Sequence, residues 1–383
     1  MCADLAVNSR AGIVQDGGPW GVHTIHGRES ILELSPLLNE FSAVSEQRGA
    51  YADLEFILSR PSTSKKKPHL LLFTRDPQKD LKTCSPRDLI GALLIYEYQA
   101  LGIGARIYAT DDSTGRRTLV APPGLQTEVV RLATRTLLER GAHAVLISYR
   151  PEPEDISNAL LPPAADGAAR YVLRRREIAS HLPLYESFDA TLAKIGRKTR
   201  TNLRYYRRRA ITDLGCTFVP QVEISEEEFQ KFQSESSFRI PQATTAWRYD
   251  SLRQMSSPVF SGIQDRRGRW LSMIGGRRLS DRMELHWQIN RDGLPEYSLS
   301  TVMRAFLIDH EISLGTRRLY LEGGTQHSLR HSFEPGQVAD LLVLRHSLLI
   351  ALLQRFSGSL MDKDNLLGQM LADPDLNWQT WRS

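Results

Sequence analysis

The sequence predicts an α/β protein made of two tandem domains, each a mixed sheet flanked by helices. The chain has 383 residues, whereas single hydrophobic cores usually stop growing at roughly 250–300 residues. Strand-like runs and helical segments occur in both halves, and one helix–glycine–strand unit appears in each. We therefore expect an N-terminal arm over 1–20, a first domain over 21–165 and a second domain over 171–383.

The repeat is found by aligning the helix-ending Gly141 with Gly315. Apolar positions of the two helices and of the following strands then coincide: Leu125 with Leu299, Val129 with Met303, Leu132 with Phe306, Ala133 with Leu307, and Val145 and Ile147 with Leu319 and Leu321. Helix–glycine–strand units are common, so chance similarity is the alternative. Both copies follow a run of strands, which favours duplication.

In the first half, the apolar spacing predicts one or two helices over 31–54 and a turn over 61–68. Strands are expected at 69–74, 89–98, 105–110 and 142–149, with a helix at 125–140. The Pro-, Asp- and Ala-rich stretch 151–167 is expected to connect the domains.

In the second half, a strand is expected at 171–173 and a basic helix at 188–210. Further strands are expected near 216–220 and at 259–264, 269–275, 283–290 and 318–322, and helices from 226 and at 299–314. The end of the chain predicts a strand or helix at 339–345 and a helix at 348–356.

The composition predicts a cytoplasmic protein. Hydrophobic residues make up 41% of the chain and charged residues 24%, as in ordinary globular proteins. The apolar stretch 341–353 is interrupted by Arg345 and His346, so we expect no membrane span, and residues 1–20 do not have the pattern of a secretory signal. Three widely separated cysteines favour a reducing compartment and offer no metal site.

The basic residues are concentrated in one segment. Eight of them lie between Lys194 and Arg209 without an acid, in a chain of formal charge +5. On a helix, Ile195, Thr199, Leu203, Tyr206 and Ala210 share an inward arc, whereas Arg197, Arg200, Arg204, Arg207 and Arg208 share another face. Such a face is often merely solvated, but guanidinium groups also suit phosphates and carboxylates. Arg197, Arg200 and Arg204 are therefore candidate substrate-binding residues.

A second group of polar residues alternates along the strand 283–290. Glu284, His286 and Gln288 share one face, and Leu285, Trp287 and Ile289 the other. Polar side chains on a strand often only face water. Here, however, the strand leads to a helix start at Tyr297–Thr301, which Ser298 or Ser300 can cap and whose amides can bind an anion.

A third group follows the strand 318–322. Glu322 precedes two glycines, and Gly324, Gln326 and His327 stand beyond it. His327 and His331 are spaced to share a metal only with further ligands, which we do not find, so no metal is expected. Walker, Rossmann and nucleophile-elbow motifs are absent from the sequence.

These residues resemble the Fem-like acetyltransferase domain of the GNAT superfamily. The resemblance rests on Pro183-Leu-Tyr-Glu-Ser-Phe188, on the arginine-rich Gly196–Arg209 and on Tyr297–Ser300, with the helix, Gly315 and Glu322-Gly-Gly324 after it. It covers about residues 171–356, and members usually carry a degenerate first copy of the fold. The family commonly has a glycine in the turn before the long helix, where this sequence has Ser298-Leu299-Ser300.

The resemblance implies transfer of an acyl group from acyl-CoA or another thioester to an amine of a sugar or small metabolite. Glu284 or Glu322 would be the base, with His286 as the alternative. Gln288 and the segment Ser298, Leu299, Ser300 and Thr301 would hold the donor. Arg197, Arg200, Arg204, Tyr297, Gly324, Gln326 and His327 would contact the substrate.

Two other functions are compatible with the sequence. The basic helix also suits aminoacyl transfer from charged tRNA, as in Fem-like relatives, although no long helical-arm insertion is visible. The lack of a glycine in the turn before the long helix is compatible with a non-catalytic GNAT-like module that binds an anion or a partner.

Overall fold

The structure is a computed structural model of the chain. It describes residues 20–45, 50–51, 53–60, 66–100, 103–111, 117–151, 169–321 and 332–345, together with residues 367, 370, 379 and 380. The chain forms two compact units, the first of Met1–Ile178 with Gln337–Ser383 and the second of Ala179–Gly336. The predicted arm, the interdomain connection beyond 151 and the helix 348–356 lie outside the described residues.

Unit 1 contains a mixed sheet in the order β1-β2-β3-β4-β6-β13-β7. Its strands are β1 (Gly21–His26), β2 (Lys66–Thr74), β3 (Leu89–Ala100), β4 (Ile103–Ala109), β5 (Leu119–Val120), β6 (Ala144–Tyr149), the first part of β7 (Arg170–Pro183), β13 (Glu334–Leu344) and β14 (Gln379–Thr380). Its helices are α1 (Arg28–Glu33), α2 (Ser35–Val44), α3 (Leu54–Leu58) and α4 (Gln126–Glu139), with short 3-10 turns at Leu81–Thr83 and Pro86–Asp88.

The segment 339–345, for which the sequence left strand and helix open, is a strand. Residues Ala339–Leu344 pair antiparallel with β6. Because of this pairing, the chain from Gln337 on belongs to unit 1, whereas the sequence analysis had assigned it to the second domain.

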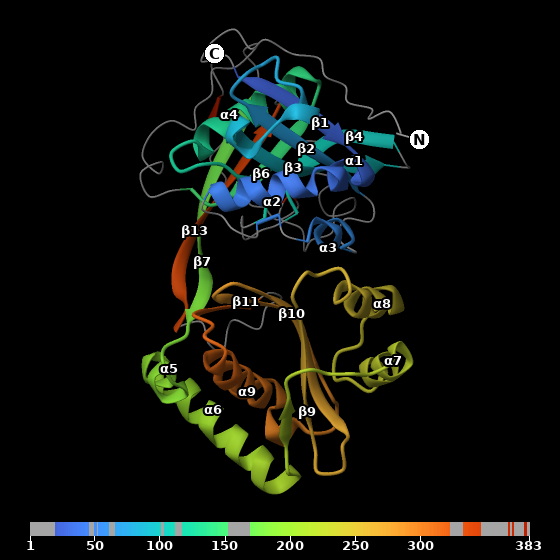
Figure 1. The fold of residues 1–383 in the computed structure, drawn as a ribbon, viewed down its shortest axis with the longest axis vertical. Helices are drawn as coiled ribbons and strands as arrows, with labels where there is room; N and C mark the ends of the chain where they lie inside the picture. The colour runs from blue at the N-terminus through green and yellow to red at the C-terminus, as the bar shows by residue number, and fades with distance from the viewer. Residues whose placement is uncertain are drawn as a thin grey trace. The chain divides into compact units, whose positions relative to one another are not determined.

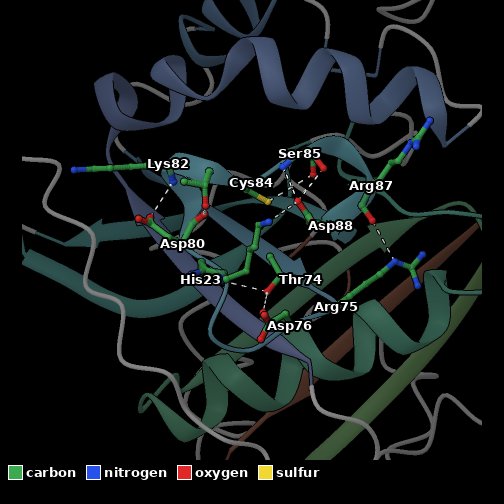
Figure 2. A network of polar contacts seen from close by, with 12 residues as sticks. His23, Thr74, Arg75, Asp76, Asp80, Lys82, Cys84, Ser85, Arg87 and Asp88 are labelled. Atoms are coloured by element: carbon green, nitrogen blue, oxygen red, sulfur yellow. Dashed lines mark hydrogen bonds and ion pairs between the residues drawn. The ribbon is translucent and has the colours of Figure 1, made fainter.

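The connection between β2 and β3 is fixed by its own polar side chains (Figure 2). The Asp88 carboxylate accepts hydrogen bonds from the amide and hydroxyl of Ser85, both at 2.8 Å, and Lys79 Nζ lies 3.1 Å away. These bonds hold the pKa of Asp88 at about 2. On the strand side, Thr74 Oγ1 donates to Asp76 O at 2.8 Å and lies 3.3 Å from His23 Nε2.

Unit 2 contains a mixed sheet in the order β7-β12-β11-β10-β9-β8. After the last residues of β7, its strands are β8 (Thr217–Val219), β9 (Pro258–Gln264), β10 (Trp270–Leu279), β11 (Arg282–Asn290) and β12 (Arg318–Leu321). Its helices are α5 (Phe188–Lys194), α6 (Arg197–Arg209), α7 (Glu226–Ser234), α8 (Gln242–Ser251) and α9 (Leu299–Ser313), with a π-helical turn at Ala210–Leu214 and a 3-10 turn at Pro295–Tyr297.

The sheet of unit 2 is covered on both faces (Figure 1). Helices α5, α6 and α9 pack on one face, in a core that includes Leu203, Met303 and Leu319. Helices α7 and α8 cover the other face, where Phe229 and Trp287 meet. Strand β11 contributes to both cores, because the pairing with β10 skips His286. Leu285 lies in the core with α9, whereas Trp287 and Ile289 lie in the core with α7. The predicted strict alternation, with Leu285, Trp287 and Ile289 on one face, is therefore wrong.

The single basic helix predicted over 188–210 is wrong, because the chain breaks it into α5 and α6. Ile195 and Gly196 both have extended ψ angles of 141°. Glycine has a low helix propensity, and Ile195 instead buries its side chain in the core. Helix α8 was not predicted from the sequence.

The two units share one local architecture. In each, antiparallel strands lead to a parallel pair joined by a helix: β4 and β6 by α4, and β11 and β12 by α9. Both helices end in the same hydrogen-bond pattern. Gly141 N donates to Leu138 O and the next amide to Leu137 O, while Gly315 N donates to Ile312 O and the next amide to Glu311 O.

Candidate functional site

The candidate site lies in unit 2, along β11 and at the start of α9. The described pairs between β11 and β12 run from Arg282↔Arg318 to Leu285↔Leu321. Strand β11 continues to Asn290 beyond the last of these pairs. One residue of this last part of β11, Gln288, contacts the first turn of α9, the helix that connects β11 and β12.

A β-bulge sets the geometry of β11 against β10. The register shifts between Gly275 and Gly276. A Cβ on Gly276 would lie 2.1 Å from Glu284 O, and a Cβ on Gly275 would lie 2.1 Å from the Trp287 ring. Two adjacent glycines therefore allow the backbone of β11 and the indole to approach β10 closely.

Glu284, a predicted base, forms an ion pair inside the sheet. Its Oε2 accepts a hydrogen bond from Arg277 Nε at 2.8 Å, and the two side chains are 3% and 0% exposed. Arg282 Nε lies 3.7 Å from the other carboxylate oxygen. Such a pair favours the charged carboxylate, so proton transfer to Glu284 would have to leave Arg277 without its charge partner.

Gln288 connects the strand to the helix. Its Nε2 donates to Asn290 Oδ1 at 3.1 Å and contacts Ser300 O, in the first turn of α9, at 3.4 Å. Its Oε1 has no hydrogen-bond partner within the part of the chain that the structure describes. Of the three polar residues predicted on this face, Gln288 is thus the one brought to the α9 terminus by a direct contact. His286, between Glu284 and Gln288, is half-buried.

The turn before α9 has a left-handed residue. Ser298 has φ 48° and ψ 57°, a conformation that favours glycine. Its carbonyl accepts from the amides of Thr301 and Val302, at 2.7 and 3.1 Å. Its hydroxyl lies 2.8 Å from Thr301 Oγ1 instead of capping a backbone amide, so the predicted side-chain cap is not formed by Ser298.

This turn leaves the first amides of α9 available. The amides of Leu299 and Ser300 precede those that bond to Ser298 O, and neither donates to another backbone group in the described residues. The Leu299 side chain is buried in the core, so its part in an anion site would come from the backbone.

Arg209 is a charged neighbour of this turn that the sequence reasoning missed. Its guanidinium lies 4.9 Å from the centroid of the Tyr297 ring, and Nη1 donates to Glu296 O at 3.1 Å. Arg209 also contacts Asp213 at 3.3 Å. Arg209 is the last residue of the basic segment 194–209, which could have indicated a binding role. The arginine face selected on the predicted helix did not include it.

The predicted arginines of α6 are on its surface. Arg197 is exposed, Arg200 Nη1 reaches Ala193 O at 3.5 Å, and Arg204 Nη2 contacts Asp189 Oδ1 at 2.6 Å. Arg207, from the same predicted face, is a packing residue. Its guanidinium lies 5.0 Å from the Phe188 ring centroid and 4.7 Å from that of Phe306. Within the described chain, no hydrogen bond or ion pair joins Arg197, Arg200 or Arg204 to β11.

Glu322, Gly324, Gln326 and His327 lie outside the described residues, so their approach to Glu284 stays a prediction. Within the described ranges, no three or more His, Cys, Asp or Glu residues are grouped to hold a metal ion. No described helix combines the length and apolarity needed to span a bilayer.

Known structures with a similar backbone exist, although no family model and no curated protein matches the sequence. FemX is 8% identical, with a TM-score of 0.46 over 76% of this chain and 91% of its own. L-PGS from Bacillus licheniformis is 9% identical, with a TM-score of 0.49 over 88% and 96%. A tandem GNAT protein from the clavulanic acid biosynthesis pathway is 11% identical, with a TM-score of 0.44 over 84% and 98%. These similarities concern the course of the backbone.

Proposed function

We propose that the chain is an acyltransferase that moves an acyl group from acyl-CoA, or another acyl thioester, to an amine of a sugar or small metabolite. The observation that carries the proposal is the left-handed Ser298 at the start of α9. This conformation leaves the first amides of the helix available. They lie next to Gln288, which links the first turn of α9 to β11. Two available amides and the nearby Arg209 guanidinium suit the pyrophosphate of a CoA donor.

In this reaction the amine attacks the thioester carbonyl, the C–N bond forms and the C–S bond breaks. The thiolate leaves with one proton, and the attacking nitrogen loses one to a base or to water. Because Glu284 is held by Arg277, we propose His286 or Glu322 as the base and assign Glu284 to positioning β11. Gln288 and the amides of Leu299 and Ser300 would orient the donor. This orientation would accelerate the reaction chiefly by proximity.

A pair of substitutions at Ser300 tests donor binding. In Ser300→Glu the new carboxylate lies in the first turn of α9, where it stabilises the helix but repels a pyrophosphate. We expect acetyl-CoA affinity, measured by calorimetry, to fall at least about tenfold (~1.4 kcal/mol), with an unchanged or higher melting temperature. Ser300→Gln, of the same size and uncharged, should bind like the wild type. Equal affinity in both variants would place the donor elsewhere.

Aminoacyl-tRNA is the second candidate donor, and it is favoured by the exposed side of α6. Arg197, Lys198, Arg204 and Arg208 are exposed there, and such a row suits a phosphate backbone. Binding to charged tRNA that weakens steeply with salt, together with no binding to acetyl-CoA, would select this donor. Absence of binding to both would favour the non-catalytic module.

A further inference from the structure

Helix α8 of unit 2 carries an arginine that has no acidic partner among the described residues. Arg248 is half-buried between α8 and α7, which lie side by side (Figure 1). Its Nη1 donates to Gln233 Oε1 at 2.9 Å, and its guanidinium lies 6.0 Å from the centroid of the Trp287 ring. Burial lowers the pKa of Arg248, and no carboxylate of the described chain counteracts this effect.

A cation in such a place is unfavourable unless an anion offsets it. The Trp287 ring offsets little, because 6.0 Å is the limit of an effective cation–π contact. Other arginines near α7 and α8 do not have this problem. Arg291 contacts Glu235 Oε2 at 2.8 Å, and Arg253 is exposed to solvent. Arg248 therefore keeps guanidinium donors for an anion from outside the chain.

A buried amide holds the Arg248 guanidinium in place. Gln233 is 4% exposed, and its Oε1 accepts from Arg248. Its Nε2 donates to Ser236 Oγ at 2.8 Å and to Phe238 O at 3.0 Å. Both ends of the amide are thus engaged. Because the guanidinium is fixed before a ligand arrives, less conformational freedom is lost on binding.

The same amide connects Arg248 to an exposed aromatic residue. The Phe238 carbonyl accepts from Gln233 Nε2 and, at 2.8 Å, from Ser236 Oγ, whereas the Phe238 side chain is 72% exposed. The backbone that carries the ring is therefore fixed, and the ring faces solvent. An aromatic ring of this kind offers a large apolar contact area to a ligand.

This segment is bonded to the end of β11. Ser237 N donates to Asn290 O at 3.0 Å. Asn290 Oδ1 accepts from Gln288 Nε2 at 3.1 Å, and Gln288 in turn contacts Ser300 O in the first turn of α9. A short series of hydrogen bonds thus connects the segment before α8 with the turn that we propose for the donor.

We propose that Arg248 binds a carboxylate of the acyl acceptor and that the Phe238 ring contacts the apolar part of the same molecule. The guanidinium presents a planar fork that matches the two oxygens of a carboxylate. The inference rests on the proposed transfer reaction and specifies its acceptor as an amino acid with an apolar side chain. The amine of that amino acid is acylated while α8 holds its carboxylate.

The test is calorimetric titration of the full-length protein with L-leucine and with L-leucinamide. The amide has the same side chain and amine but no carboxylate. We expect saturable binding of leucine and at least about tenfold weaker binding of leucinamide. Equal affinities, or no binding of leucine, would overturn the carboxylate site. Titration with acetyl-CoA measures the donor site separately. Loss of leucine binding alone contradicts this inference, whereas loss of acetyl-CoA binding contradicts the proposed transfer reaction.

Two arginine variants separate Arg248 from general charge effects. Arg248→Gln should bind leucine at least about tenfold more weakly than the wild type. Arg253→Gln is the matched control, because Arg253 is exposed just after α8, where it lies 5.3 Å from the Tyr249 ring centroid. It should leave the affinity unchanged. Unchanged binding in Arg248→Gln, or equal losses in both variants, would overturn the assignment.

Phe238→Ala tests the apolar contact in a variant that should fold, since the side chain is largely exposed. We expect several-fold weaker binding of leucine at an unchanged melting temperature. If Arg248→Gln does not fold, Arg248→Lys takes its place. Lysine keeps the charge but not the planar fork, so leucine should again bind more weakly than in the wild type. Wild-type affinity in both Phe238→Ala and Arg248→Lys would contradict the proposal.

Discussion

Gly124 and Ser298 occupy equivalent positions in the two units and share a left-handed backbone. The alignment that places Gly141 on Gly315 also places Gly124 on Ser298, and their φ angles are 78° and 48°. Each residue precedes the long helix that joins the parallel strands of its unit. The turn before this helix therefore requires positive φ, and unit 2 achieves it with serine despite the strain.

Ser298→Gly should stabilise the protein. Glycine adopts the left-handed region without the steric penalty of a Cβ, which is about 1 kcal/mol or more. We expect a melting temperature higher by a few degrees, measured by calorimetry, and acetyl-CoA affinity within a factor of about two of the wild type, since the amides stay in place. Ser280→Gly is the control. It removes a left-handed serine, φ 54°, from the β10–β11 turn and should stabilise similarly. A lower melting temperature for Ser298→Gly would mean that the Thr301 contact outweighs the strain.

The half-buried Arg200 and the exposed Arg204 of α6 are expected to affect binding and not stability. Arg200→Glu with Arg204→Glu should weaken donor or acceptor binding several-fold while changing the free energy of unfolding by less than about 1 kcal/mol, since the Arg204–Asp189 pair is largely exposed. Arg207→Gln is the contrasting variant. It loses contacts with two aromatic rings and with Asp309 at 2.6 Å, so we expect a loss of about 1–3 kcal/mol. Unfolding of the double variant would show that its arginines have a structural role.

The local pattern of the sequence was enough to predict the long helices, their glycine ends and most strands. Helix α9 and Gly315 follow directly from apolar spacing and from the C-terminal glycine rule. The break before α6 was missed because the arginine-rich spacing continues across Ile195 and Gly196.

The site was less predictable, since its contacts depend on strand pairing. Glu284 and Arg277 are direct partners next to a bulge, and the register of this pairing is not visible in either strand alone. The sequence pattern predicts a polar position at Glu284, but it does not show that Arg277 lies opposite to it on the neighbouring strand. Arg209 was missed for a similar reason, because its contact with Tyr297 joins segments far apart in the chain.

A histidine pair in unit 1 predicts acid sensitivity. His69 and His26 share a hydrogen bond of 2.7 Å between their Nδ1 atoms, and Glu97 Oε2 lies 3.4 Å from His69 Nε2. Burial, then the positive charges of His26, Lys67 and Arg140, lower the pKa of His69 to about 3. The unfolded chain thus binds the proton more readily, so the stability from this group is complete above about pH 6.5 and decreases as the pH falls toward 3.

The expected loss from His69 is about 2 kcal/mol between pH 7 and pH 5. Native-state hydrogen exchange of the β2 amides at the two pH values measures it in unit 1 alone. His69→Asn removes the titrating ring. The free energy of exchange of the β2 amides should therefore depend less on pH in this variant than in the wild type. Equal pH dependence in both proteins would assign the effect to other groups, such as His26, whose pKa is also lowered by burial.

The buried pair of Glu284 and Arg277 provides the sharpest test of the predicted base. Glu284→Gln leaves the fully buried guanidinium of Arg277 without its charge partner, so we expect a loss of about 3–5 kcal/mol in urea unfolding. Replacing both residues, Glu284→Leu with Arg277→Met, removes both charges and should restore most of that stability. A Glu284→Gln protein that melts like the wild type would contradict the structural role. The folded double variant then separates the structural role of Glu284 from a catalytic one. If acyl transfer is retained, the base is His286 or Glu322. If turnover is lost while acetyl-CoA affinity is unchanged, Glu284 is the base.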